Sequence, residues 1–315
     1  MLRRNRPANL WTFVLNDLRN GESVAVESSS RVFLARRSRD RPFAQTNHAQ
    51  HAETRERETA AYGTLANSEF RFDRLLSGIE KAPDGVGALA KLLAYQEDPL
   101  GQLSAYHDVL KSETIQTVLF EARGDSVRLA VTVDPAPASS GKYAVFSLAD
   151  LWGAGAPAWE ARDYVGTSPE VRQRQRTFTS AYVNYFEERR FAEASAMLAS
   201  QRTLDAALFR CVAMADAGRY EDSLRIADEA LRDPRFTGEP AYVRESLTQV
   251  RLIALYRLGR KDEARVLARI VVDQKPKQPA LGELARRIAN REHVPAWRLA
   301  VHFDFFSGDL GGRKD

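Results

Sequence analysis

The spacing of apolar residues changes once along this 315-residue chain, and that change limits the possible folds more than any other feature. Up to about residue 150, several segments alternate between apolar and polar residues, which is the period of a β-strand. Beyond residue 178, every apolar pattern has the spacing of an amphipathic helix. Residues 152–178 are rich in glycine and proline, as linkers are. We therefore expect a first domain over residues 1–151, a linker over 152–178 and a helical domain over 179–292.

The first domain begins with a pattern that predicts a β-meander. The expected strands are residues 11–15, 24–27 and 32–35, and the turn-forming sequence Arg19-Asn20-Gly21 separates the first two. From Leu65 the apolar spacing becomes helical until Pro83-Asp84-Gly85, and a second helix follows from Val86. Residues 114–120 and 127–133 then predict a hairpin, with one more strand at 143–146. The first domain is therefore expected to be α+β.

Three similar turns mark the helical domain. Each separates two amphipathic helices, and their sequences are residues 188–194, 217–223 and 258–264. This organisation resembles tetratricopeptide repeats, in which a small residue stands at the turn and an alanine on the second helix. The resemblance implies stacked helical hairpins, because one hairpin alone cannot bury its apolar face. For residues 293–315 the sequence leaves two alternatives open, a strand that returns to the first domain or an apolar tail on the last repeat.

Composition excludes several classes of protein. The net charge of +4 is small and spread out, and the densest basic run, residues 36–41, lacks interleaved aromatic residues, so we predict no nucleic-acid partner. No window is apolar enough to span a membrane and the start lacks the pattern of a signal peptide, which favours the cytoplasm. One cysteine, Cys211, leaves no internal disulfide or thiol metal site. We predict no metal and no cofactor, although His48, His51 and Glu53 are residue types that bind zinc or iron.

Two short motifs in the first domain point to chemistry. Thr46-Asn47-His48 follows the predicted meander, and Ser68-Glu69-Phe70-Arg71 lies on the predicted helix. Together with Val24-Ala25-Val26-Glu27, their order and spacing resemble the C-terminal part of the acyl-coenzyme A:6-aminopenicillanate acyltransferase family. This family of autoproteolytic N-terminal-nucleophile enzymes is related to the choloylglycine hydrolases. The resemblance covers a little under half of the chain and implies a partial layered sheet-and-helix domain.

The resemblance also implies roles for four residues. Asn47 would donate a side-chain N–H to the oxyanion that forms when an amide or thioester carbonyl is attacked, and Arg71 would hold charge beside the nucleophile. Thr46 and His48 would contact the substrate. A fixed oxyanion donor contributes about 3 kcal/mol in the transition state, and arginine stays protonated at any working pH. A structural alternative remains open, in which Asn47 closes a turn and Arg71 pairs with Glu69 or Asp73 on the surface.

The sequence departs from this family at the nucleophile. The family's catalytic cysteine begins the mature chain, whereas the first ten residues here contain no Cys, Ser or Thr. Cys211 lies in a helical pattern without a histidine near it, so we expect it to be a buried hydrophobic residue. We therefore expect the chain to be a downstream fragment or a degenerate pseudoenzyme that does not turn over substrate as given.

Two functions follow from these patterns. The first is the remnant or fragment of an acyltransferase or amidohydrolase acting on C–N amide or acyl thioester bonds, with an acyl-amide or acyl-coenzyme A type small molecule as its ligand. The second is a non-catalytic scaffold that binds a protein partner through the helical repeats of residues 179–292.

Overall fold

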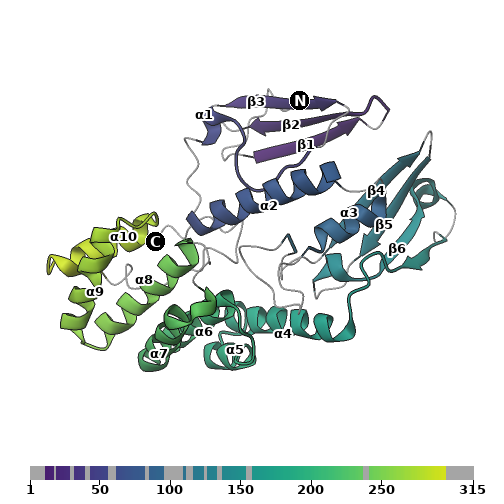
Figure 1. Cartoon of the computed structure of the whole chain (residues 1–315). Coiled ribbons are helices and arrows are strands. Elements are labelled where there is room, and N and C mark those ends of the chain that lie inside the picture. The colour runs from purple at the N-terminus through teal and green to yellow at the C-terminus, as the bar shows by residue number, and fades with distance from the viewer. Residues whose placement is uncertain are drawn as a thin grey trace.

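The computed structural model describes two small antiparallel sheets and a series of helices (Figure 1). The α+β class expected from the sequence is confirmed. The described residues are 11–17, 19–28, 32–39, 43–55, 62–81, 85–95, 109–110, 116–123, 126–132, 137–153, 158–236 and 241–295. The first ten residues and most of the 293–315 segment lie outside these ranges, so the two alternatives for that segment stay predictions.

The first sheet is the predicted meander. Its antiparallel strands, in the order β1-β2-β3, are β1 (Trp11–Asp17), β2 (Glu22–Ser28) and β3 (Phe33–Arg39). The Asp17 carboxylate accepts the backbone N–H groups of Arg19 and Asn20, and Gly21 adopts a φ of 63° that closes the turn. The second half of β2 is buried, and it faces the loop that carries the Thr-Asn-His motif.

The two predicted helices follow this sheet. A short helix, α1 (Ala52–Arg55), precedes α2 (Tyr62–Lys81), which lies beside the meander in Figure 1, and α3 (Val86–Leu93). Helices α2 and α3 approach closely, because a Cβ atom at Gly78 would stand 2.5 Å from the Leu92 side chain. A glycine at this position therefore permits the contact.

The second sheet contains the predicted hairpin. Its antiparallel order is β4-β5-β6-β7, formed by β4 (Thr117–Arg123), β5 (Ser126–Thr132), β6 (Tyr143–Ser147) and β7 (Glu160–Arg162). Two 3-10 turns flank β6, η1 (Ala138–Ser140) and η2 (Leu148–Trp152). The apolar core of this sheet packs Leu119, Tyr143 and Val145 against Ala90 of α3. Burial raises the pKa of the Tyr143 hydroxyl to about 12, so this hydroxyl stays protonated and donates to the Ser139 carbonyl.

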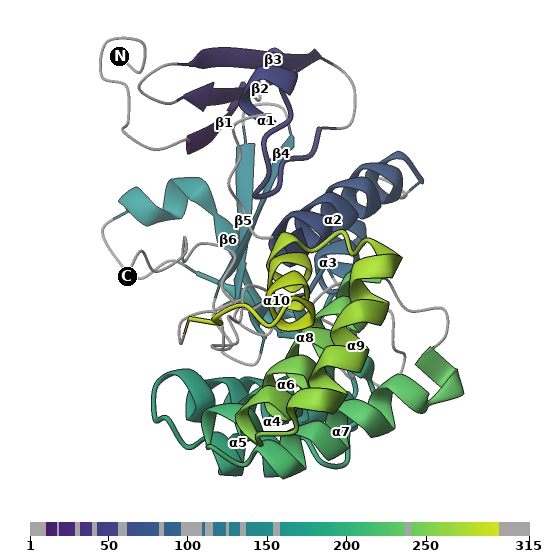
Figure 2. The ribbon, with the colours of Figure 1, turned by 90° about the vertical axis from the view of Figure 1, so that its left-hand side faces the viewer.

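Helices form the rest of the described chain and curve beneath the two sheets in Figure 1, with α10 returning toward α2 in the turned view of Figure 2. They are α4 (Pro169–Phe186), α5 (Phe191–Met197), α6 (Leu204–Asp216), α7 (Tyr220–Arg232), η3 (Pro234–Phe236), α8 (Ala241–Arg257), α9 (Lys261–Gln274) and α10 (Pro279–Ala289). Two apolar clusters hold them together, one centred on α4 to α8 and one on α8 to α10.

The three turns noted in the sequence share a backbone conformation. Each has one residue in the left-handed region, Arg189, Gly218 or Gly259, with φ of 54°, 73° and 74°. An arginine follows each of them and begins the next helix with φ between −93° and −77° and ψ between 56° and 67°. The fourth residue of each second helix is small and fully buried: Ala194, Ser223 and Ala264. The hairpins therefore meet through short side chains that let their backbones approach.

The segment predicted to be a linker, residues 152–178, contains ordered elements. Strand β7 pairs with β6, and α4 begins at Pro169, where the Ser168 hydroxyl accepts the N–H of Val171. A proline in the first turn of a helix is favourable because its missing N–H has no partner there in any case. The Gln175 side chain, on α4, accepts from the hydroxyl of Ser140 beside β6. The sheet and the helices are thus joined by buried hydrogen bonds.

Candidate functional site

The loop that carries Thr46, Asn47 and His48 is fixed to the first sheet by a buried carboxylate. Glu27, on β2, is 1% exposed and accepts the backbone N–H of Gln50 at 2.6 Å. It also accepts a hydrogen bond from the hydroxyl of Thr54 in α1. A buried carboxylate is costly unless such bonds replace its hydration. Glu27 therefore anchors both ends of the segment 50–54 against the strand.

A second anchor comes from the neighbouring strand. The guanidinium of Arg36, on β3, donates from Nη2 to the Ala44 carbonyl at 2.9 Å and to Gln45 Oε1 at 3.0 Å. It also lies over the Phe43 ring, 4.4 Å from its centroid. The Gln45 amide then donates to the carbonyls of Thr46 and His48 at 3.0 and 3.1 Å. This chain of bonds sets the backbone of the Thr-Asn-His motif.

The side chains of Thr46, His48 and Ser68 bond to one another where this loop meets α2. The Thr46 hydroxyl donates its single proton to the Ser68 carbonyl at 2.9 Å. Atom Nδ1 of His48 lies 3.1 Å from the Thr46 oxygen and 3.0 Å from the Ser68 Oγ. The amide nitrogen of Gln50, which only donates, faces the other ring nitrogen, Nε2, so Nε2 accepts and the proton lies on Nδ1. The ring is thus in its Nδ1–H tautomer.

This tautomer determines what Ser68 does. Burial lowers the pKa of His48, and the nearby Arg55 charge lowers it further, so the ring is neutral at pH 7. A serine becomes a nucleophile when an unprotonated ring nitrogen takes its proton, and here the nitrogen beside Ser68 is the protonated one. Both side chains are also almost fully buried. The Ser68–His48 pair therefore positions the loop on α2 and does not form a catalytic dyad.

Asn47 and Arg71, the two residues to which the sequence assigned catalysis, are in contact. Nη2 of Arg71 donates to Oδ1 of Asn47 at 2.7 Å, and Nε donates to Oδ1 of Asn67 at 3.0 Å. Since arginine only donates, each carboxamide turns its oxygen toward Arg71 and its Nδ2 away from it. Asn47 is exposed at the end of the cluster, whereas Asn67 is buried.

Glu69, one of the two partners considered for Arg71, forms an ion pair with Arg55 of α1. All four predicted site residues thus gather in one cluster between the first sheet and α2. The sequence patterns did not assign Gln45, Asn67 or Arg36 to this cluster, and they gave Glu27 no role. The signal available for Glu27 was a charged residue at an inward position of an alternating strand.

Cys211 lies away from this cluster, in the core of the helices. It is fully buried on α6, and its thiol donates to the Leu208 carbonyl at 3.1 Å. Burial raises its pKa far above the ordinary thiol value, so the reactive thiolate is suppressed.

Comparison of the chain with models of protein families, with curated proteins and with solved structures finds no match. Across the described ranges, no helix combines the length and the apolar character that crossing a bilayer requires. In the same ranges, no group of three or more His, Cys, Asp or Glu side chains could hold a metal ion. His48, His51 and Glu53 accordingly form no such group.

Proposed function

We propose that the Asn47–Arg71 cluster binds the carbonyl oxygen of an amide or acyl thioester. The chain would then be the remnant or fragment of an acyltransferase or amidohydrolase of the N-terminal-nucleophile type. The observation that supports this proposal is the 2.7 Å bond from Arg71 to Asn47 Oδ1, which fixes the orientation of the exposed carboxamide. A preorganised amide donor beside a permanent positive charge is suited to stabilising an oxyanion.

We also propose that this chain does not turn over substrate by itself. Ser68 is held next to a protonated ring nitrogen, and Cys211 is buried in the helical core with its thiol protonated. A nucleophile supplied from outside is therefore needed to reveal the site. A small thiol such as cysteamine meets this need. Its thiolate attacks the carbonyl carbon of an activated ester, the oxyanion collapses, and p-nitrophenolate leaves as the thioester forms.

The experiment measures cysteamine thiolysis of p-nitrophenyl phenylacetate with and without the protein. Wild-type protein should accelerate the reaction saturably, and Asn47→Ala should remove most of that acceleration because the oxyanion donor is lost. Arg71→Met should have a similar effect. Asn16→Ala, on exposed β1, is the matched control and should retain wild-type rates. Equal rates for Asn47→Ala and Asn16→Ala would contradict the proposal.

A second function, protein binding by the helices, is favoured by one observation on α9. Val266 and Ile270 are spaced by four residues on one helix face and are 60% and 49% exposed. Exposed apolar side chains that form a continuous patch on the surface mark interaction sites. Capture of a partner by the full chain should be lost in the double variant Val266→Ser, Ile270→Ser and kept in Arg269→Gln. Unchanged capture by the double variant would count against this function.

A further inference from the structure

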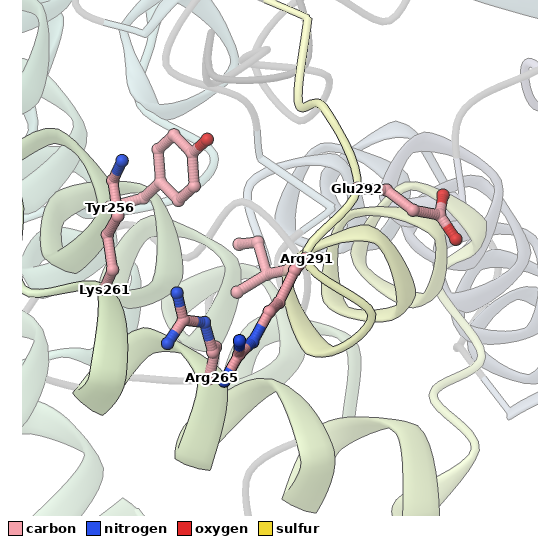
Figure 3. A pocket seen from close by; sticks show the side chains of 6 residues that line it. Tyr256, Lys261, Arg265, Arg291 and Glu292 are labelled. Atoms are coloured by element: carbon pink, nitrogen blue, oxygen red, sulfur yellow. The ribbon is translucent and has the colours of Figure 1, made fainter.

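A second polar site lies among the last three helices, away from the Asn47–Arg71 cluster. A pocket of about 110 Å³ opens between the end of α8, the first turns of α9 and the end of α10 (Figure 3). Its lining residues are Tyr256, Lys261, Arg265, Ile288, Arg291 and Glu292. We refer to it as the basic pocket.

The charges around the basic pocket are unbalanced. Its lining has three cationic side chains and one carboxylate, a net charge of +2 by this count. In Figure 3 the side chains of Arg265 and Arg291 extend from different elements into the same space, while the Glu292 carboxylate points away from them. Like charges that converge repel each other unless an anion lies between them. The arrangement is therefore suited to a bound anion.

The ion-pair partner of Arg265 lies outside the pocket. Arg265 forms an ion pair at 2.5 Å with Asp262, whose side chain is 95% exposed and does not line the pocket. The Lys261 ammonium stands 5.9 Å from the centre of the Tyr256 ring, at the side of the pocket. The Glu292 carboxylate accepts a hydrogen bond from Asn290. An exposed ion pair of the Arg265–Asp262 type is weak in water, so it competes poorly with an anion inside the pocket.

The size and the floor of the pocket narrow the class of ligand. Ile288 is buried and, with the Tyr256 ring, gives the pocket an apolar wall that strengthens electrostatic attraction. A cavity of about 150 Å³ admits a benzene molecule, so the basic pocket has room for one group of about five heavy atoms. Guanidinium groups match the geometry of phosphate oxygens in paired hydrogen bonds. A phosphate monoester carries a charge close to −2 at pH 7, which balances the lining.

We propose that the basic pocket binds a phosphate monoester or inorganic phosphate as the dianion, with Arg265 and Arg291 as its principal ligands. Lys261 contributes charge from the side, and the Tyr256 ring forms part of the wall. This site is independent of the acyl-oxygen function proposed for the first domain, because the two share no residue.

Titration calorimetry of the full chain with inorganic phosphate tests the proposal. Wild-type protein should bind phosphate saturably with one site, and Arg265→Gln and Arg291→Gln should each weaken binding at least tenfold. Arg269→Gln removes the same charge from an exposed position of α9 outside the pocket, and it should bind like the wild type. Circular dichroism confirms that each variant is folded. Absence of saturable binding, or equal weakening by all three variants, would overturn the proposal.

Further ligands identify the chemistry and the source of the phosphoryl group. Acetate, a monoanion, should bind at least tenfold more weakly than phosphate, and equal affinity would contradict a dianion site. A phosphoserine peptide and adenosine monophosphate each present the same group. Tighter binding of the peptide identifies a protein source, and tighter binding of the nucleotide identifies a small-molecule source. A glutamate peptide of the same sequence should bind weakly, and its binding as tightly as the phosphopeptide would sink the phosphoryl assignment.

Discussion

The Asn47–Arg71 cluster and the helical region bury their side chains by opposite means. Around the cluster, the buried groups are polar, and hydrogen bonds between distant segments hold them, as between Glu27 and Thr54 or His48 and Ser68. Among α4 to α10 most of the buried groups are apolar or small, and they pack around residues such as Phe209 and Leu247. The first region depends on directional bonds and the second on area removed from water.

The two regions therefore contribute differently to the fold. Buried polar atoms stabilise a fold only when each has a partner, and both regions keep some without one among the described residues, such as Asn67 Nδ2 in the first and the Ser195 hydroxyl among the helices. Such groups cost free energy wherever they lie, so the two regions differ in their apolar packing and not in these atoms. The helices around Cys211 supply the apolar packing that stabilises the fold.

The largest expected effect comes from emptying the helical core. Phe209, on α6, is fully buried and its ring lies 5.4 Å from the ring of Tyr185 and 6.0 Å from that of Phe178. Phe209→Ala should lower the free energy of unfolding by about 3–5 kcal/mol, because it leaves a cavity that the helices cannot fill. Urea denaturation measures this loss. Val266→Ala, at an exposed position of α9, should change the free energy of unfolding by less than about 0.5 kcal/mol. A similar loss in both variants would mean that the helical core is not what stabilises the fold.

A smaller loss is expected when the buried carboxylate of the first region is neutralised. Glu27→Gln keeps the shape but weakens the bonds to the Gln50 N–H and the Thr54 hydroxyl, which should cost about 1–3 kcal/mol. Hydrogen exchange of the Gln50 amide should accelerate in the same variant. Glu22→Gln is the control, since Glu22 forms a surface ion pair with Arg37. If the Gln50 amide exchanges at the same rate in both variants, the anchoring role of Glu27 is wrong.

Most elements of the fold were predictable because their apolar period is regular. The meander, α2, α3 and the β4–β5 hairpin all appear where the spacing predicted them. Strand β7 was missed because all three of its residues are exposed, so it has no inward face to produce an alternation. The start of α4 was missed for another reason. Ser168 and Pro169 form a helix start signal, and the glycine-rich context before them favoured a linker.

The candidate site was predictable only in part. The resemblance placed Asn47 and Arg71 together, and the structure has them in contact. Arg36 acts through a bond to Gln45, nine positions away, which depends on tertiary placement and carries no periodic signal. Asn67 stands four residues before Arg71 on α2, a spacing at which helical side chains meet, so this bond was open to prediction from the sequence.

The pH dependence of stability should also differ between the two regions. Burial and Arg55 lower the pKa of His48 below its ordinary value of 6.5, so the unfolded chain binds this proton more readily than the folded one. Stability from this residue is therefore complete above pH 6.5 and falls as the pH drops from 6.5 through the lowered pKa. His48→Gln should flatten that part of a stability profile measured by urea denaturation. Exposed His293→Gln should leave the profile unchanged, and an acid loss that persists in His48→Gln would exclude His48 as its cause.

The smallest effects are expected from one chemical change made at two glycines of the helical region. Gly218 has a φ of 73° at the turn before α7, and Gly218→Ala should cost about 1 kcal/mol even though nothing lies within 4 Å of the added Cβ atom. Gly282 lies inside α10, where the Cβ atom would touch the Pro276 ring at an ordinary 3.6 Å. Gly282→Ala should therefore stabilise the protein by about 0.5–1 kcal/mol through helix propensity and a less flexible unfolded chain. Both variants change the buried area by almost the same amount. Changes of opposite sign in the free energy of unfolding, measured by urea denaturation, would therefore trace the difference to backbone conformation. Changes of the same sign would mean that the turn at Gly218 is not held in its left-handed form.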